Sequence, residues 1–385
     1  MACVYLFNPE NDTALGVDSP MYTPPLAARM LHDDGSLLPL WWADGTDDVV
    51  LTPFVSEGEA LRRRYGLKGT PSVGVPSSPL PYRLCPWGWS RDAARQLRMA
   101  GVNDALLPTP ERLAALRQLS HRRNAVKVME RLTEAMPGYR FPRLPREVWS
   151  VDEITGMEGA IYVKLPWSSS GRGVHRWDTA NLTPGDMSRI RGMIANQGSV
   201  MVEAALDRIC DFAALFSCDG EGNARYRGLS LFATDTRGGY EGNIVADECC
   251  LRHIISQYVD IDEYDAITRH LEKILGDIYG RAYRGWLGVD MMSYADGSDG
   301  NTRLIAPCVE VNMRMTMGVV AHLLRRNPLI AGMMPARFTV GRKSGDAEGI
   351  ELSYREGAAF HFRVSPGGVS GNHGELRKDA APAIP

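Results

Sequence analysis

The sequence predicts a chain of mixed fold class, in which an open α/β layer is followed by antiparallel strands, and three observations carry this expectation. The chain has 385 residues, which is too long for one small core and predicts two or three subdomains. Apolar, strand-like runs alternate with helical patterns in its first part. Further along, two strand-like runs lie close together and are joined by a polar turn, which predicts an antiparallel hairpin.

The composition is typical of a globular protein that works in water. Hydrophobic residues make up 44% and charged residues 23%, and the formal net charge is -3. This balance gives no overall attraction to nucleic acid or to anionic lipid, so we expect neither as a partner. No apolar run approaches the ~20 residues that a membrane helix needs.

The cysteines and the first residues predict a cytoplasmic location. The 7 cysteines are odd in number and form no C-x-x-C pair, which is typical of reduced thiols rather than of a disulfide framework or a zinc knuckle. The N-terminal run MACVYLFNPEND has no basic stretch ahead of an apolar one and is therefore not a secretory signal.

The first part of the chain predicts a strand that ends in a polar loop, Asn8 to Asp12, whose role the sequence does not reveal. A stretch rich in Pro, Ser and Gly, at 71–88, is expected to be a loop, and Ser90 to cap the helix after it. In order, we expect a strand at 3–7, a helix at 24–34, short strands at 36–42 and 47–51, a helix at 56–65, and a helix from Ser90 to about residue 100.

The middle of the chain changes from helical to strand-like patterns. The segment 109–135 is helical with a break near Ser120, which could cap a second helix. The pair Thr183-Pro184 is a typical helix start. The elements expected here are strands at 160–165 and 199–204, a helix at 183–196, a strand pair at 211–218 and 226–233, and an amphipathic helix at 260–280.

The last hairpin, formed by 288–292 and 304–312, carries a candidate metal site. Glu310, Asn312 and Arg314 are spaced by two, so all three can face one side of a strand. Asp290 on the neighbouring strand adds a second carboxylate. Two carboxylates and an amide oxygen are hard ligands that suit Mg²⁺. The alternative is a solvated strand face with an incidental ion pair to Arg314.

A strand ending in Lys164 is followed by a loop of small residues that could cover phosphates. Its backbone N–H groups and hydroxyls could contact the phosphate oxygens, with Lys164 as a point charge. The loop is neither a Walker A loop nor a Rossmann turn, and an ordinary turn between strands is the alternative. The candidate residues are Lys164, Ser168, Ser169, Ser170, Gly171 and Gly173.

Three further features could complete a nucleotide site. An apolar strand that contains Met201 ends in Glu203 and could hold a purine, and Asp211 could accept hydrogen bonds from ribose hydroxyls, although a buried strand with a boundary glutamate is the commoner case. Arg237, in a glycine-rich loop, could bind phosphate or a substrate carboxylate, or could simply be exposed to solvent.

The order of these features resembles that of the ATP-grasp superfamily over roughly residues 119–335. The features are, in order, the lysine strand, the serine-glycine loop, the Glu203 strand, the Asp290 strand and the Glu310-x-Asn312-x-Arg314 strand. That family includes D-alanine–D-alanine ligase, glutathione synthetase and biotin carboxylase. The resemblance implies two α+β subdomains that sandwich ATP, at 119–200 and 201–340. They would follow an N-terminal α/β domain at 1–118 and precede a C-terminal extension at 341–385.

The resemblance also implies roles for these residues. Asp290, Glu310 and Asn312 would bind Mg²⁺, with Mn²⁺ as an alternative ion. ATP would be bound by Lys164, the loop from Ser168 to Gly173, Met201, Glu203 and Asp211. An earlier basic residue would also bind ATP, and Arg122 and Lys127 are the alternatives for it. Arg314 and Arg237 would contact phosphate or substrate. Met313 departs from the family, because many members have proline there.

The activity implied by the resemblance is that of an ATP-dependent ligase, which activates a small-molecule carboxylate as an acyl phosphate for attack by an amine or another nucleophile. A small-molecule kinase of the same fold and a nucleotide-binding protein without turnover are the alternatives. Dimers are common among proteins that resemble this one, so a homodimer is compatible with the sequence. The acid and the nucleophile stay open.

Overall fold

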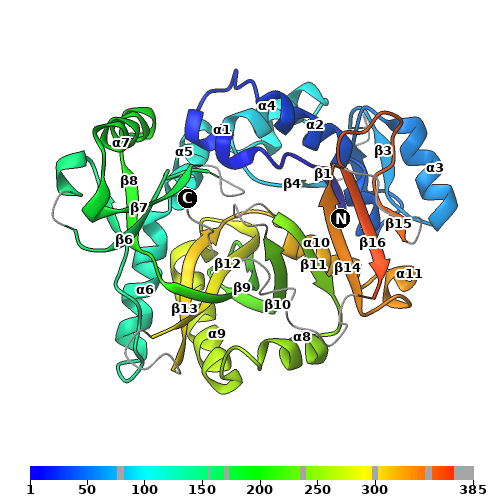
Figure 1. Ribbon diagram of the computed structural model, residues 1–385. Helices are drawn as coiled ribbons and strands as arrows, with labels where there is room; N and C mark the ends of the chain where they lie inside the picture. The colour runs from blue at the N-terminus through cyan, green and yellow to red at the C-terminus, as the bar shows by residue number, and fades with distance from the viewer. Residues whose placement is uncertain are drawn as a thin grey trace.

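The computed structural model describes residues 1–75, 82–154, 157–168, 173–234, 240–296, 302–342 and 349–367. Its strands form three sheets, and Figure 1 shows the small sheet with β6, β7 and β8 at one side, the large sheet in the centre and the N-terminal strands above and beside it. The mixture of a parallel sheet with antiparallel ones confirms the predicted fold class. Among the described residues, no helix is both long and apolar enough to cross a membrane.

The N-terminal sheet is parallel and has the strand order β3-β2-β1-β4. This arrangement confirms the open α/β layer, and Ser90 caps α4 by accepting a hydrogen bond from the Ala93 N–H. The strands are β1 (Ala2–Leu6), β2 (Val49–Leu51), β3 (Thr70–Ser72) and β4 (Tyr82–Pro86), and the helices are α1 (Asn11–Val17), α2 (Leu26–Gly35), α3 (Val55–Tyr65) and α4 (Arg91–Met99).

Two expectations for this region are wrong. The segment 36–42 is not a strand but contains a 3-10 helix at Leu38–Trp41, all of whose residues are buried. Pro39, near its start, lacks the N–H that a strand would donate. The segment 71–88 is not only loop, because it contributes to β3 and contains β4. Pro71 is tolerated in β3 because that strand lies at a sheet edge.

The second sheet is small and antiparallel, with the order β5-β8-β6-β7. Thr183 caps α7 in a capping box with Asp186, as expected. Ser120 does not cap α6, because Arg122 occupies the N-cap position. The elements are α5 (Pro110–Leu119), α6 (Arg123–Ala135), β5 (Arg146–Val148), β6 (Ala160–Lys164), β7 (Val174–Asp178), α7 (Pro184–Gln197) and β8 (Val200–Ala204).

The large sheet has the order β13-β12-β9-β10-β11-β14-β16-β15, and its β12–β13 pair confirms the predicted hairpin. Its strands are β9 (Asp207–Asp219), β10 (Ala224–Thr234), β11 (Tyr240–Val245), β12 (Arg284–Ala295), β13 (Arg303–Asn312), β14 (Ala336–Gly341), β15 (Ile350–Glu351) and β16 (His361–Pro366). Its helices are α8 (Glu248–Ile255), α9 (Ile261–Leu275), α10 (Met317–Leu324) and α11 (Pro328–Ala331).

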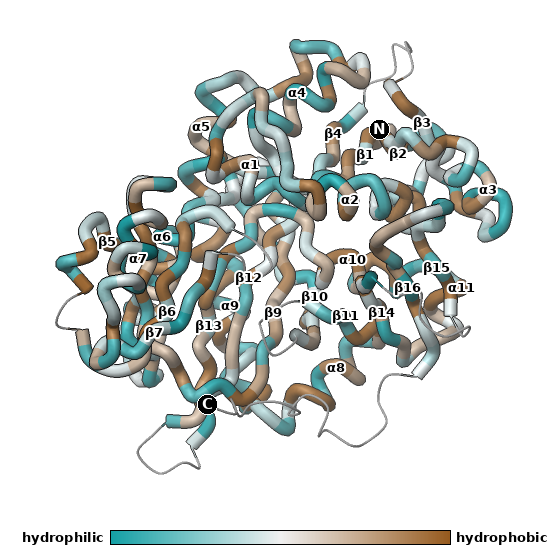
Figure 2. The backbone as a smooth tube through the Cα atoms, turned by 45° about the horizontal axis from the view of Figure 1, so that its top comes forward, coloured by the Kyte–Doolittle hydropathy of each residue, from teal (hydrophilic) through white to brown (hydrophobic). Residues whose placement is uncertain are grey.

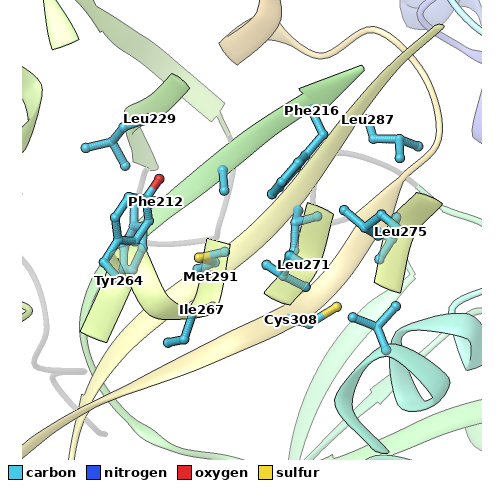
Figure 3. Close-up of a cluster of buried hydrophobic side chains, with 14 of the residues drawn as sticks. Phe212, Phe216, Leu229, Tyr264, Ile267, Leu271, Leu275, Leu287, Met291 and Cys308 are labelled. Atoms are coloured by element: carbon cyan, nitrogen blue, oxygen red, sulfur yellow. The ribbon is translucent and has the colours of Figure 1, made fainter. Parts of the chain in front are cut away.

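One face of the large sheet forms the main core against α9. Figure 3 shows Phe212 and Phe216 of β9 beside Ile267 and Leu271 of α9, all fully buried. Figure 2 shows brown, hydrophobic stretches along β9, whereas the peripheral α3 is largely hydrophilic. Because side chains alternate along a strand, the neighbours of the core residues on β9, β12 and β13 point to the opposite face, where the candidate site lies.

Candidate functional site

Asp290 and Glu310 face each other across the β12–β13 pair. They are Cα partners in the ladder, and Gly288 is the partner of Asn312 two residues further along. The Asn312 Nδ2 donates a hydrogen bond of 3.0 Å to an Asp290 carboxylate oxygen. The sheet therefore brings together the two carboxylates and the amide that the sequence singled out.

The surroundings of this pair favour the neutral form of Asp290. Burial and the nearby Glu310 raise the pKa of Asp290 to about 7, against the opposing effects of Arg314 and Asn312. Within the described part of the chain, no three His, Cys, Asp or Glu side chains form a metal cluster. The candidate ligands are the Asp290 and Glu310 carboxylates and the Asn312 amide, whose Oδ1 accepts a hydrogen bond from Arg314. Two carboxylates that face each other across a strand pair fit a hard divalent cation.

Arg314 is held by a residue of α1. Its Nε and Nη2 contact Asp12 Oδ2 at 2.8 and 2.6 Å, and its Nη2 donates to Asn312 Oδ1 at 2.8 Å. Both members of the ion pair are largely buried, with side chains 12% and 14% exposed. The first turn of α1, which follows β1 and was expected to be part of a loop, therefore reaches the candidate metal site.

The segment that joins β1 to α1 is anchored just after the end of β4. Asn8 Nδ2 donates to the Gly88 carbonyl at 2.9 Å, and a Cβ at Gly88 would lie 2.4 Å from Asn11 Nδ2, so glycine is required there. The carbonyl of Trp87, the residue before Gly88, accepts a hydrogen bond of 2.8 Å from the Met315 N–H. The ends of β1 and β4 are thus tied to the segment that follows β13.

Arg122, at the start of α6, joins Glu310 to the loop after β6. Its Nη2 contacts the Glu310 carboxylate at 2.9 and 3.0 Å, and its Nη1 donates to Ser168 Oγ at 2.7 Å. The Arg122 Nε is buried and has no hydrogen-bond partner. Lys127, the alternative to Arg122, is exposed further along α6.

Lys164 and Glu203 form an ion pair on the small sheet. Lys164 ends β6, its Cα partner on β8 is Met201, and Glu203 lies two residues further along β8, on the same face. Lys164 is 8% exposed and Met201 is 3% exposed. The three residues therefore share one buried corner of this sheet.

Asp211 links this corner to the large sheet. It lies on β9 opposite Met292, and its carboxylate contacts Arg208 at 2.5 Å. Burial raises the pKa of Asp211, while Arg208 and Lys164 lower it. Because Asp211 also contributes to the raised pKa of Asp290, the residues from the two sheets form one electrostatic cluster.

Several predicted residues lie outside the described residues. These are Ser169, Ser170 and Gly171 of the loop, together with Arg237. Of the loop, Ser168 and Gly173 are described, and Gly173, with a φ of 73°, accepts a hydrogen bond of 2.8 Å from the Leu165 N–H. This contact closes the base of the loop between β6 and β7.

The sequence did not identify Asp12 or His121 as parts of this region. His121 precedes Arg122 and packs edge-on against Trp167 at a centroid distance of 4.6 Å. Burial and neighbouring arginines lower its pKa to about 3, so the imidazole is neutral. Asp12 could have been found from its place after a buried parallel strand, where loops often form sites. No local signal marked His121.

Comparison with solved structures shows that the chain has the ATP-grasp fold. It superposes on N5-carboxyaminoimidazole synthetase from Staphylococcus aureus, solved with ADP, with a TM-score of 0.50 and 12% identity over 96% of this chain and 94% of that one. It superposes on a biotin carboxylase–ATP complex from Campylobacter jejuni with a TM-score of 0.52 and 10% identity over 94% and 86%. No protein-family model and no curated protein sequence matches the chain.

Proposed function

We propose that the protein is an ATP- and Mg²⁺-dependent ligase that activates a small-molecule carboxylate as an acyl phosphate. The observation that carries the proposal is the pair of facing carboxylates, Asp290 and Glu310, on the sheet opposite the Lys164–Glu203 pair. Burial, and after it the Glu310 carboxylate, raise the pKa of Asp290 to about 7, which is a cost that a purely structural site would have little reason to bear.

In this proposal the nucleotide lies between the two sheets. Met201 and Glu203 contact the adenine, Asp211 contacts the ribose, and Lys164 contacts the phosphates. Asp290, Glu310 and Asn312 hold Mg²⁺, or Mn²⁺, which would neutralise charge on the phosphate oxygens. The loop from Ser168 to Gly173, including Ser169, Ser170 and Gly171, covers the phosphates.

Arg122 has a positioning role in this arrangement. It already contacts both Glu310 and Ser168, so it connects the metal ligand to the base of the covering loop. Its buried and unpartnered Nε is the one donor of the guanidinium that no described group satisfies. We expect the Arg122 guanidinium to donate a hydrogen bond to a phosphate oxygen when the nucleotide binds.

The proposed reaction has two steps. A carboxylate oxygen of the acid forms a bond to the γ-phosphorus of ATP, and the bond from that phosphorus to the bridging oxygen breaks, which releases ADP. An amine or another nucleophile then attacks the acyl carbon, and inorganic phosphate leaves. In this proposal Arg314, which pairs with Asp12, attracts anionic oxygens of the phosphate or the acid, and Arg237 has the same role.

A phosphate-release screen tests the proposal. The full chain is incubated with ATP, Mg²⁺ and pairs of small acids and amines, and we expect phosphate and ADP only with a cognate acid. Glu310→Gln should lose this turnover, whereas Glu130→Gln, at an exposed position on α6, should keep it. Turnover by Glu310→Gln at the wild-type rate would refute the metal assignment. A stable phosphorylated product without free phosphate would instead indicate a kinase.

A further inference from the structure

A large cavity lies between the N-terminal sheet and one end of the large sheet. Its volume is about 1200 Å³, and it is lined by β1 and β4 on one side and by β9, β10 and β12 on the other. Figure 1 shows β4 above the upper ends of these central strands. Such a volume exceeds what most small-molecule sites need.

The cavity wall carries a strong excess of positive charge. Two carboxylates, Asp44 and Asp219, line it, and the Asp219 carboxylate is already used by three hydrogen bonds within its own turn. Among the described residues, none of the lining arginines forms an ion pair. These arginines are Arg83, Arg112, Arg225, Arg227, Arg284 and Arg326.

The sheet itself directs part of this charge into the cavity. Arg225 and Arg227 lie on β10, and between them Tyr226 points to the opposite face, where it packs against Phe216. Arg227 Nε donates to Ser217 Oγ at 2.7 Å, which fixes the guanidinium over β9. On β12, Arg284 is the Cα partner of Asp219. Three guanidinium groups, on the two strands that flank β9, thus line one cavity, and no ion pair to a described residue neutralises them.

Aromatic rings line the same space. Five of the eight tryptophans of the chain are among the lining residues: Trp41, Trp42, Trp87, Trp89 and Trp286. Trp286 is the Cα partner of Ser217, which in turn is the partner of Arg225. A flat ring can therefore stack beside a row of guanidinium groups, an arrangement that favours an anion with an aromatic or planar body.

The cavity is separate from the candidate ATP site. Asp290, Glu310, Asn312 and Lys164 do not line it. On β12, Gly288 lies between Asp290 and Trp286, and its partners across the sheet are Asn312 and Leu215. Leu215 packs in a small apolar cluster with Val319 and Leu323 of α10, and this cluster lies against Trp286 and Met315 of the cavity wall.

We propose that this cavity is a second binding site, which takes a small polyanion with a planar ring. The ligand would supply the counter-charge that the lining arginines lack, and its ring would pack on the tryptophans. The inference does not depend on the proposed ligase activity, because no residue of the metal site takes part in it. Met315, which follows Arg314 directly, lines the cavity and gives the two sites a short connection.

Fluorescence anisotropy with pyrenetetrasulfonate, a planar tetra-anion, tests the proposal on the full chain. We expect one dye molecule per chain, with an affinity that falls as salt is added. Arg225→Glu and Arg284→Glu should each weaken binding about tenfold or more, because each turns an attraction into a repulsion. Arg191→Glu, at an exposed position on α7 away from the cavity, is the matched control and should bind as the wild type does.

Four results would overturn the proposal. The first is an absence of dye binding. The second is an equal loss of affinity in Arg191→Glu and the cavity variants, which would indicate non-specific attraction. The third is a loss of dye binding in Glu310→Gln, which would make the cavity part of the nucleotide site. The fourth is a change of sedimentation in Arg225→Glu without any dye binding by the wild type, which would indicate a contact between two copies. Failure of the ligase assay alone leaves the dye result unaffected.

Discussion

Replacing Lys164 with methionine tests how the small sheet holds its buried charge. Methionine keeps most of the length and packing of the side chain but leaves the Glu203 carboxylate without its partner. The two side chains are only 10% and 17% exposed. Removing one partner of a fully buried pair costs about 3–5 kcal/mol. Because some exposure remains here, we expect Lys164→Met to lower the free energy of unfolding by about 3 kcal/mol.

Urea unfolding of Lys164→Met, Glu203→Gln and the double variant measures this effect. The double variant should be less destabilised than the sum of the two single variants, with a coupling of about 2 kcal/mol, because it leaves no unpaired charge. Arg98→Met is the control, since the Arg98–Asp104 pair has side chains 56% and 73% exposed. That substitution should cost under about 1 kcal/mol. An equal cost for Lys164→Met and Arg98→Met would refute the reasoning.

Two further predictions concern pH. Burial, Glu310 and Asp211 raise the pKa of Asp290 to about 7, against the opposing effects of Arg314 and Asn312, so the Asp290 proton must leave before a cation binds. We therefore expect the affinity for Mg²⁺·nucleotide to rise between pH 6 and 8, with proton release measured by calorimetry. An affinity that does not change over this pH range would contradict the prediction. The pKa of His121 is about 3 in the folded protein and about 6.5 when unfolded, so the unfolded state binds more protons below pH 6.5 and stability falls as the pH decreases. At pH 5 this loss of stability is about 2 kcal/mol. In urea unfolding, the free energy of unfolding of His121→Gln should fall less between pH 7 and 5 than that of the wild type. An equal fall in both proteins would contradict the low pKa of His121.

The part of the fold that could be predicted depends on local patterns. Strand alternation and turn residues placed the β12–β13 hairpin, and spacing by two put Glu310 and Asn312 on one face. Capping residues located the starts of α4 and α7. These features are set within a few residues, so a single sequence contains the information.

The rest depends on contacts between distant segments. The run around Trp41 looked like a strand because it is apolar, yet it is buried as a 3-10 helix against Tyr65. The pairing of Asp12 with Arg314 joins residues that lie 302 positions apart, and no local pattern encodes it. Which of Arg122 and Lys127 lies beside Glu310 likewise depends on which side of α6 faces β13, and no local pattern reveals this.

The central claim is that Asp290 and Glu310 together hold a divalent cation needed for nucleotide binding. The most direct measurement is calorimetric titration of ATP into the protein with Mg²⁺ and with EDTA, for the wild type and for the Asp290→Asn/Glu310→Gln double variant. We predict that Mg²⁺ strengthens ATP binding to the wild type and that this gain is lost in the double variant. An equal gain in both proteins would contradict the account.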